Sequence, residues 1–300
     1  MCELFSLSSR IPTVATVSID AFARRGGRDT RNSDGWGVAF YNGPDVRIYR
    51  EPEPAGDSAW LSFIRRRRMP GRLMFSHVRH ATQGAVSLVN TQPFARELGG
   101  RMHVFAHNGR LDGIETKFAG EWHRFRPIGT TDSEVAFCIL LERLSSLWQG
   151  SGPPPLADRL AIVSRFAAEM RALGPANFLY ADGDVLFAHG HRRLQDDGVI
   201  APPGLWRLCR ECANDPDAPP QASIVSGSGA LHQEITLIAS VPLNAERWIP
   251  LTEGQVIVVK DGRPLRTDKP TARKSRRRAH LGAIARHKET CSEIPAYRQQ

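Results

Sequence analysis

The chain has 300 residues, of which 41% are hydrophobic and 24% charged, and this predicts a soluble protein with one large core or two smaller ones. No apolar run approaches the ~18–20 residues of a membrane span, and residues 1–20 lack a basic start followed by an apolar stretch, so we predict neither membrane association nor a secretory signal. Five scattered cysteines argue against a disulfide framework, and we expect a cytoplasmic protein.

The net charge of +9 is concentrated near the C-terminus. Residues 269–288 contain eight Lys or Arg and no acid, which leaves a net +1 for the rest of the chain. We therefore predict a folded domain over residues 2–267, with Met1 removed, and a basic, flexible tail over 268–300. Such a tail could bind nucleic acid or another polyanion through residues 269–288, although a solvated end is an equally good interpretation.

Strands are the commonest elements predicted in the first 110 residues. The first begins after Cys2 and is expected to end in a serine-rich turn at Ser8–Ser9, and residues 24–35 are expected to form a loop. A hairpin, a short helix and two further strands are then predicted, at 36–41 with 46–52, 58–68, 71–82 and 102–109.

Two helices and more strands follow. In the first helix, over 130–147, Thr131 and Glu134 have the spacing of a capping box, and the second helix covers 156–174. Hairpins or strands are then predicted at 176–190, 223–227, 234–240 and 255–266. Strands, then helices, then strands predict an α+β layered domain.

Cys2 would become the first residue once Met1 is removed. Its thiol would then lie next to a free α-amine with a reference pKa of roughly 7.7–8.0, which could serve as its base. A lone cysteine near a terminus is more often a small hydrophobic residue, so the rest of the chain decides between the two interpretations.

Three polar clusters fall at predicted strand ends or in loops, where sites are often built. Arg79, in RHATQG, offers a bidentate fork for a carboxylate, or is a surface arginine. Asn108 and Gly109, in HNG, could form a two-donor oxyanion hole, or a common turn. Asp132, in TTDSE, could bind an ammonium group, or simply favour the first turn of a helix.

Together, Cys2, RHATQG, HNG and TTDSE occur in an order and over a span that resembles class II glutamine amidotransferases, which are N-terminal-nucleophile (Ntn) hydrolases. MCELF, SDGWGVAFY, SHVRHATQGAVSLVNTQPF and FAHNGRLDG look most like the stand-alone YafJ-like branch, and the similarity covers roughly residues 2–265. The resemblance implies a four-layer αββα sandwich with two antiparallel sheets.

The resemblance also implies residue roles and an activity. It implies a nucleophile at Cys2, carboxylate binding by Arg79 with Thr82, an oxyanion hole at Asn108 and Gly109, and ammonium binding by Asp132. The implied reaction is glutamine hydrolysis through a γ-glutamyl thioester, without a cofactor or metal. The sequence departs from many relatives at two places. His80 stands where tryptophan is common, and Asn90 to Pro93 lacks the histidine that precedes proline in many relatives.

Three interpretations of the activity remain open. The ammonia could pass to a separate synthase, because the chain contains no synthase domain. Alternatively, the substrate could be another γ-glutamyl amide, as in the hydrolase of ergothioneine assembly. A third hypothesis is an inactive Ntn fold that binds nucleic acid through its tail, which a salt-dependent DNA or RNA shift lost on truncation at Asp268 would support.

Other candidate residues favour structural roles. Cys209 and Cys212 form a single C-x-x-C, and the H-x-H of His189 and His191 would be needed to complete a zinc site, so ordinary buried thiols are the better interpretation. We also expect His77 and His107 to be hydrogen-bonded core or supporting histidines. The six tryptophans, including Trp36 and Trp60, are expected in the core.

Overall fold

The computed structural model describes residues 2–14, 24–27, 30, 32–212, 225–226 and 233–268. These residues belong to one compact unit that ends at Pro270. The predicted tail lies outside the described residues except for Asp268, so its boundary and its role stay predictions. No helix in the described ranges is long and apolar enough to cross a membrane.

The first sheet has β1 near its centre. Its order is β14-β11-β13-β1-β4-β2-β3, with β12 also paired to β1, and all neighbouring strands are antiparallel. Its strands are β1 (Glu3–Val14), β2 (Trp36–Asn42), β3 (Asp45–Glu51), β4 (Gly71–Val78), β11 (Trp206–Cys212), β12 (Val225–Ser226), β13 (Gln233–Ala239) and β14 (Ile249–Pro250). The first residue of the described chain therefore leads directly into the middle of a sheet.

The second sheet is also antiparallel throughout, with the order β16-β15-β8-β7-β6-β5. Its strands are β5 (Phe94–Leu98), β6 (Arg101–Gly109), β7 (Ala176–Ala181), β8 (Leu186–Gly190), β15 (Gln255–Lys260) and β16 (Arg263–Asp268). A separate two-stranded ribbon joins β9 (Arg193–Leu194) to β10 (Ile200–Ala201).

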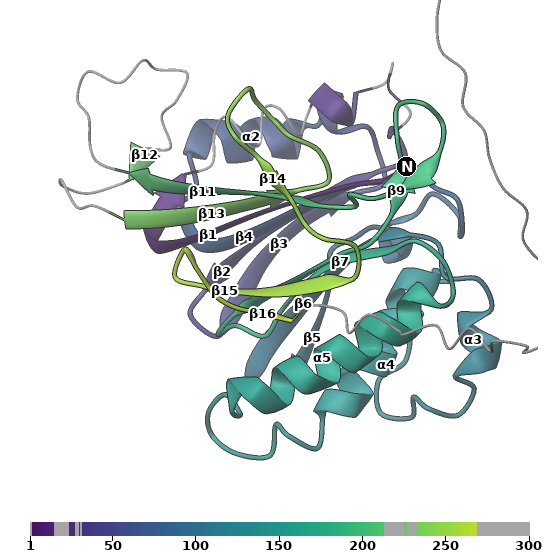
Figure 1. Cartoon of the computed structure of the whole chain (residues 1–300). Helices are drawn as coiled ribbons and strands as arrows, with labels where there is room; N and C mark the ends of the chain where they lie inside the picture. The colour runs from purple at the N-terminus through teal and green to yellow at the C-terminus, as the bar shows by residue number, and fades with distance from the viewer. Residues whose placement is uncertain are drawn as a thin grey trace, which may run out of the picture. The chain divides into compact units, whose positions relative to one another are not determined.

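Helices cover the outer faces of the two sheets, giving the four αββα layers (Figure 1). On the first sheet, α2 (Ala59–Arg67) buries Leu61 and Ile64 against β1 and β2. On the second sheet, α4 (Asp132–Leu144) and α5 (Leu156–Arg171) pack over β6 and β7. Shorter segments are α3 (Ile114–Lys117) and the 3-10 turns η1 (Ala55–Asp57) and η2 (Leu88–Asn90).

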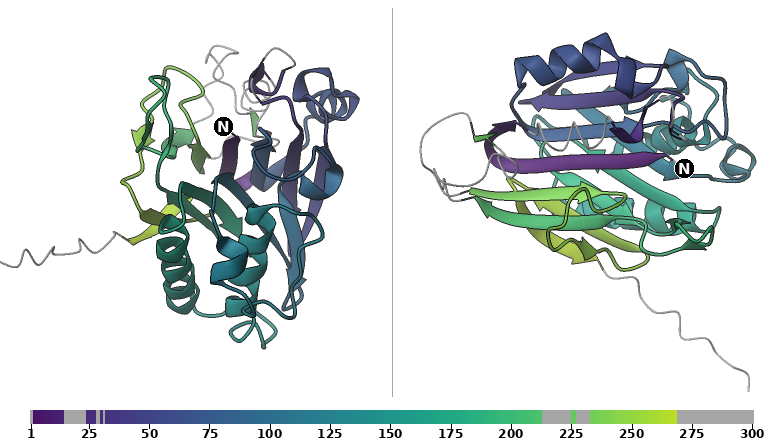
Figure 2. Two further views of the ribbon diagram at one scale, coloured as in Figure 1. Left: turned by 90° about the vertical axis from the view of Figure 1, so that its right-hand side faces the viewer. Right: turned by 90° about the horizontal axis from the view of Figure 1, so that it is seen from above.

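The two sheets pack face to face through small and branched side chains. Leu4, Phe75, Ala106, Leu179 and Ile257 belong to this inner layer, and all are essentially inaccessible to solvent. Strand alternation makes this layer, because every second side chain of β1, β4, β6 and β7 points inward. Figure 2, seen from above, shows β1 as the long central strand with the N-terminus at one end.

The structure confirms the α+β sandwich and corrects several local expectations. The chain does not turn at Ser8–Ser9, because β1 continues to Val14 while the Ser8 hydroxyl accepts the amide of Gly262 at 3.1 Å. In α4, Thr131 caps Glu134 as predicted, but the Glu134 carboxylate binds Gly129 N–H and Arg96 instead of closing the capping box.

Two expectations about buried side chains are also wrong in part. Trp36 lies in the core, whereas Trp60 is 53% exposed and belongs to the surface. His77 is buried as predicted, but neither of its ring nitrogens has a hydrogen-bond partner among the described residues. Burial lowers the pKa of His77 to about 3, helped by the charge of Arg79.

This buried histidine predicts a loss of stability in acid. Because the folded-state pKa of His77 lies below the unfolded value of ~6.5, its neutral form favours folding fully above that pH and less as the pH falls. Between pH ~6.5 and about 3, the free energy of unfolding should fall by about 1.4 kcal/mol per pH unit from this group. The free energy of unfolding in urea, measured as a function of pH, should fall less steeply in acid for His77→Leu. For the exposed control His123→Leu, it should fall as steeply as for the unaltered protein. Equal slopes in all three proteins would contradict the prediction.

Candidate active site

Cys2 lies half-buried where β1 begins, between β4 and the end of β6. Its Sγ accepts a hydrogen bond from the His80 amide at 3.2 Å and lies 3.3 Å from the His80 carbonyl oxygen. Burial raises the pKa of the Cys2 thiol, while the His80 amide and the Arg79 charge act in the opposite direction. The thiol is thus held by the backbone of the RHATQG segment.

Asn108 lies near the end of β6 and faces the inner layer, so it meets the start of β1. Its Nδ2 donates to the carbonyl oxygen of Cys2 and to Ser240 Oγ, the latter at 3.3 Å. Its Oδ1 is buried without a hydrogen-bond partner among the described residues. The amide of Asn108 is therefore in direct contact with the residue predicted as nucleophile.

Gly109 ends β6 with a φ of +157°, in a conformation that glycine adopts readily. A Cβ at this position would lie 1.8 Å from the Pro175 carbonyl oxygen, so no side chain fits. The Arg110 amide donates to the same oxygen at 3.1 Å. This close approach to Pro175 is the physical reason for glycine in HNG.

Arg79 follows β4 directly, and its guanidinium is buried inside the loop that it begins. It donates to the carbonyl oxygens of Gln83, Gly84 and Ala85 at 3.0–3.1 Å. Burial lowers the pKa of Arg79, partly offset by Cys2. Thr82 lies exposed in the same loop. In this structure, Arg79 thus shapes the 80–85 loop.

Asp132 is the first residue of α4, and both of its carboxylate oxygens accept backbone amides. These are Leu111 N–H at 2.7 Å and Ser133 N–H at 2.8 Å. The Ser133 hydroxyl contacts His107 Nδ1 at 2.8 Å, which ties the start of α4 to β6. His107 is buried and hydrogen-bonded, as expected for a supporting residue, and burial lowers its pKa.

Three supporting residues were not singled out from the sequence. Asp34 accepts the Ala81 amide at 2.7 Å and so fixes the loop after Arg79. Asn177 pairs with Asn108 across β6 and β7, and its Nδ2 donates to the Asn108 carbonyl oxygen at 3.0 Å. Ser240 bridges Asn108 and the Leu4 amide. Only SDGWG, which contains Asp34, gave a sequence signal.

The second departure from the family pattern is well accommodated. Asn90 donates to the Ala85 carbonyl oxygen and accepts the Thr130 amide, at 3.0 and 2.8 Å. Gln92 exchanges two hydrogen bonds with the His107 backbone. Both amide side chains therefore join the 80–92 loop to neighbouring segments.

The alternative zinc interpretation gains no support. Cys209 is exposed on β11, whereas His189 is buried on β8 and contacts the Gln255 carbonyl oxygen. Among the described residues, no group of three or more His, Cys, Asp or Glu side chains could hold a metal ion. The expectation of buried thiols is wrong for Cys209, and the side chain of Cys212 lies outside what the structure describes.

The layers and the cysteine at the head of a central strand define an Ntn-type sandwich. The sequence matches the family of class II glutamine amidotransferases over residues 1–281, and the chain belongs to this family. It is 33% identical to YafJ of Escherichia coli K12, over 85% of this chain and 96% of that protein.

Solved structures agree with this assignment. A predicted glutamine amidotransferase from Pseudomonas aeruginosa PA01 is 29% identical and superposes with a TM-score of 0.61, covering 88% of this chain and all of the other. The glutamine phosphoribosylpyrophosphate amidotransferase of Bacillus subtilis, at 15% identity and a TM-score of 0.54, shares the fold over 89% of this chain and 49% of its own.

Proposed function

We propose that this chain hydrolyses the side-chain amide of glutamine, with Cys2 as nucleophile after removal of Met1. The observation that carries the proposal is the contact of Cys2 with two motif segments. Its Sγ lies 3.2 Å from the His80 amide, and its carbonyl oxygen accepts Asn108 Nδ2. Segments far apart in the sequence thus meet at Cys2.

The proposed attack begins with proton transfer from the thiol to the free α-amine of Cys2. The thiolate adds to the carboxamide carbon, and negative charge develops on the amide oxygen. Asn108 Nδ2 and the Gly109 amide are proposed to stabilise that oxyanion. Collapse breaks the C–N bond, the α-ammonium returns its proton to the departing ammonia, and water then hydrolyses the γ-glutamyl thioester to glutamate.

The zwitterionic head of glutamine needs one fixed cation and one fixed anion. We assign these roles to Arg79, assisted by Thr82, and to Asp132. Arg79 binds three loop carbonyls in this structure, so a substrate carboxylate would share or replace those bonds. An ionised carboxylate has about four acceptor sites, so Asp132 can take an ammonium in addition to its two amides.

The proposal has two forms, which differ in the leaving group and in what receives it. A separate synthase would receive the ammonia in an amidotransferase, whereas a γ-glutamyl amide hydrolase would release its amine directly. The proposed roles of Arg79 and Asp132 are identical for both, since each binds only the γ-glutamyl head. Turnover of glutamine compared with other γ-glutamyl amides by the purified chain separates the two.

The proposal is tested by intact-mass analysis after incubation with 6-diazo-5-oxo-norleucine, followed by peptide mapping. We expect loss of Met1 and one adduct, located on Cys2. Excess glutamine should slow the labelling, because both compounds would occupy the same pocket. A folded protein that has lost Met1 and remains unlabelled would overturn the proposal, as would an adduct on Cys209.

A further inference from the structure

A cavity of about 1360 Å³ opens at the far end of the strands from Cys2. It is lined by the β2–β3 hairpin, the C-terminal end of α2 and the turns after β7 and β15. Ser8 and Ser9 of β1 lie on its wall, about 20 Å along the strand from Cys2 at ~3.3 Å per residue. None of the six residues proposed for glutamine chemistry lines it.

The wall of this cavity carries positive charges that no acidic side chain among the described residues neutralises. Arg47 and Arg72 are exposed on its wall, and neither has a hydrogen bond or ion pair from its guanidinium among the described residues. Within the part of the chain that the structure describes, the one contact of the Arg67 guanidinium is with the ring of Phe63, 5.8 Å from its centroid. By contrast, Lys260 is neutralised by Asp184 at 2.8 Å. Three guanidinium groups therefore remain available to a ligand.

The acidic residues of the wall do not cancel this charge. Asp184 is already paired with Lys260 and with the buried Arg159, at 2.9 Å from the latter. Asp45 and Asp261 are the two other acids of the wall. Arg47, Arg67 and Arg72 thus outnumber the unpaired acids, which favours an anion over a cation.

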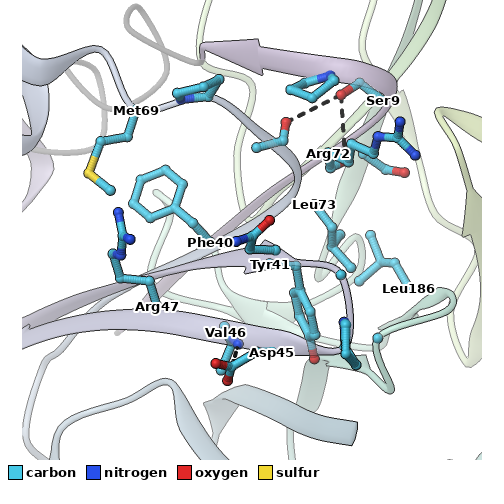
Figure 3. A pocket seen from close by; sticks show the side chains of 18 of the residues that line it. Ser9, Phe40, Tyr41, Asp45, Val46, Arg47, Met69, Arg72, Leu73 and Leu186 are labelled. Atoms are coloured by element: carbon cyan, nitrogen blue, oxygen red, sulfur yellow. Dashed lines mark hydrogen bonds between the residues drawn. The ribbon is translucent and has the colours of Figure 1, made fainter.

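The rest of the wall combines polar side chains, among them Ser8, Ser9 and Asn42, with apolar and aromatic ones. Phe40 and Met69 lie beside Arg47, and Leu73 lies toward Arg72 (Figure 3). Tyr49 and Phe63 also line the cavity, and both pack against Trp60, with ring centroids 6.1 Å apart in each case. A planar ring could bury its faces on these side chains, where a guanidinium nearby adds stacking and charge.

We propose that this cavity binds an aromatic phosphate of mononucleotide size. Its ring would pack on the half-buried Met69 and Phe63, and its phosphate would accept hydrogen bonds from Arg47 and Arg67, because guanidinium forks match phosphate oxygens. The volume exceeds the ~300–1,000 Å³ of ordinary small-molecule pockets, so a nucleotide fits with solvent around it. This site lies outside the glutamine chemistry and does not depend on it.

The test is equilibrium dialysis of the full chain against labelled AMP at low salt, with adenosine and inorganic phosphate as competitors. We expect AMP to bind with a Kd at least about tenfold below that of either competitor, since only AMP supplies both halves of the interaction. The variant Arg47→Ala/Arg67→Ala should weaken AMP binding by about tenfold or more. Arg165→Gln, an exposed arginine on α5 outside the cavity, is the matched control and should bind as the unaltered chain does.

Two results would overturn the proposal. One is no AMP binding at millimolar concentration by a protein with an unaltered melting temperature. The other is AMP binding that is equally strong in Arg47→Ala/Arg67→Ala, which would place the nucleotide on the basic segment 269–288 or elsewhere. A Met69→Ala variant gives a further check, because it should weaken AMP binding while leaving the affinity for inorganic phosphate unchanged.

Discussion

Replacing Cys2 by alanine is expected to lower kcat for glutamine hydrolysis by about 10⁴-fold or more, which is the scale of losing a covalent nucleophile. The change removes the Sγ that lies between the His80 amide and carbonyl, and leaves the strand pairing of β1 intact. Ammonia release from glutamine, followed by a coupled assay, measures the effect.

The matched control is Cys209→Ala, which removes the exposed thiol of β11 and should leave turnover unchanged. Circular dichroism and the melting temperature show that both variants are folded. Normal turnover by Cys2→Ala would mean that another group carries out the attack, and the proposed mechanism would be wrong.

Replacing Asn108 by alanine is expected to lower kcat by about 10²–10³-fold, because one of two proposed oxyanion donors is lost. Asn108 also contacts the Cys2 carbonyl oxygen, so a purely positional role has to be distinguished. Alkylation of Cys2 by iodoacetamide makes that distinction, since it develops no oxyanion. An oxyanion role predicts slow turnover with an unchanged alkylation rate.

The control is Asn42→Ala, at the exposed end of β2, which should change neither rate. If Asn108→Ala slows alkylation and turnover by the same factor, Asn108 only positions Cys2. Unchanged turnover would remove Asn108 from the mechanism altogether.

The sequence correctly predicted elements that depend only on residues close together in the chain. The hairpin of β15 and β16 turns at Asp261–Gly262 as predicted, with φ of +50° and +83°. The sequence did not predict β5, because this strand has only five residues and two of them are Arg96 and Glu97. It did not predict β11 either, because Arg207, Arg210 and Glu211 interrupt the apolar pattern of that strand.

What could not be predicted depends on segments that meet only after folding. The pairing of Asn177 with Asn108, and the bridge from Ser240, require knowledge of sheet order. The enclosure of Arg79 by its own loop is likewise a property of backbone geometry. The roles of Cys2, Arg79, Thr82, Asn108, Gly109 and Asp132 follow from the family resemblance and stay predictions until they are tested.

The central place of β1 has a consequence for synthesis on the ribosome. One edge of β1 pairs with β4, but the other pairs with β13, so the partner of Leu4 across that edge lies more than 230 residues later. Residues emerge in order from the N-terminus, and long-range pairing waits for both partners. On the mechanism proposed above, Met1 can therefore be removed while this edge of β1 is still open, and the pocket closes around a mature cysteine only after residues 233–239 have been synthesised.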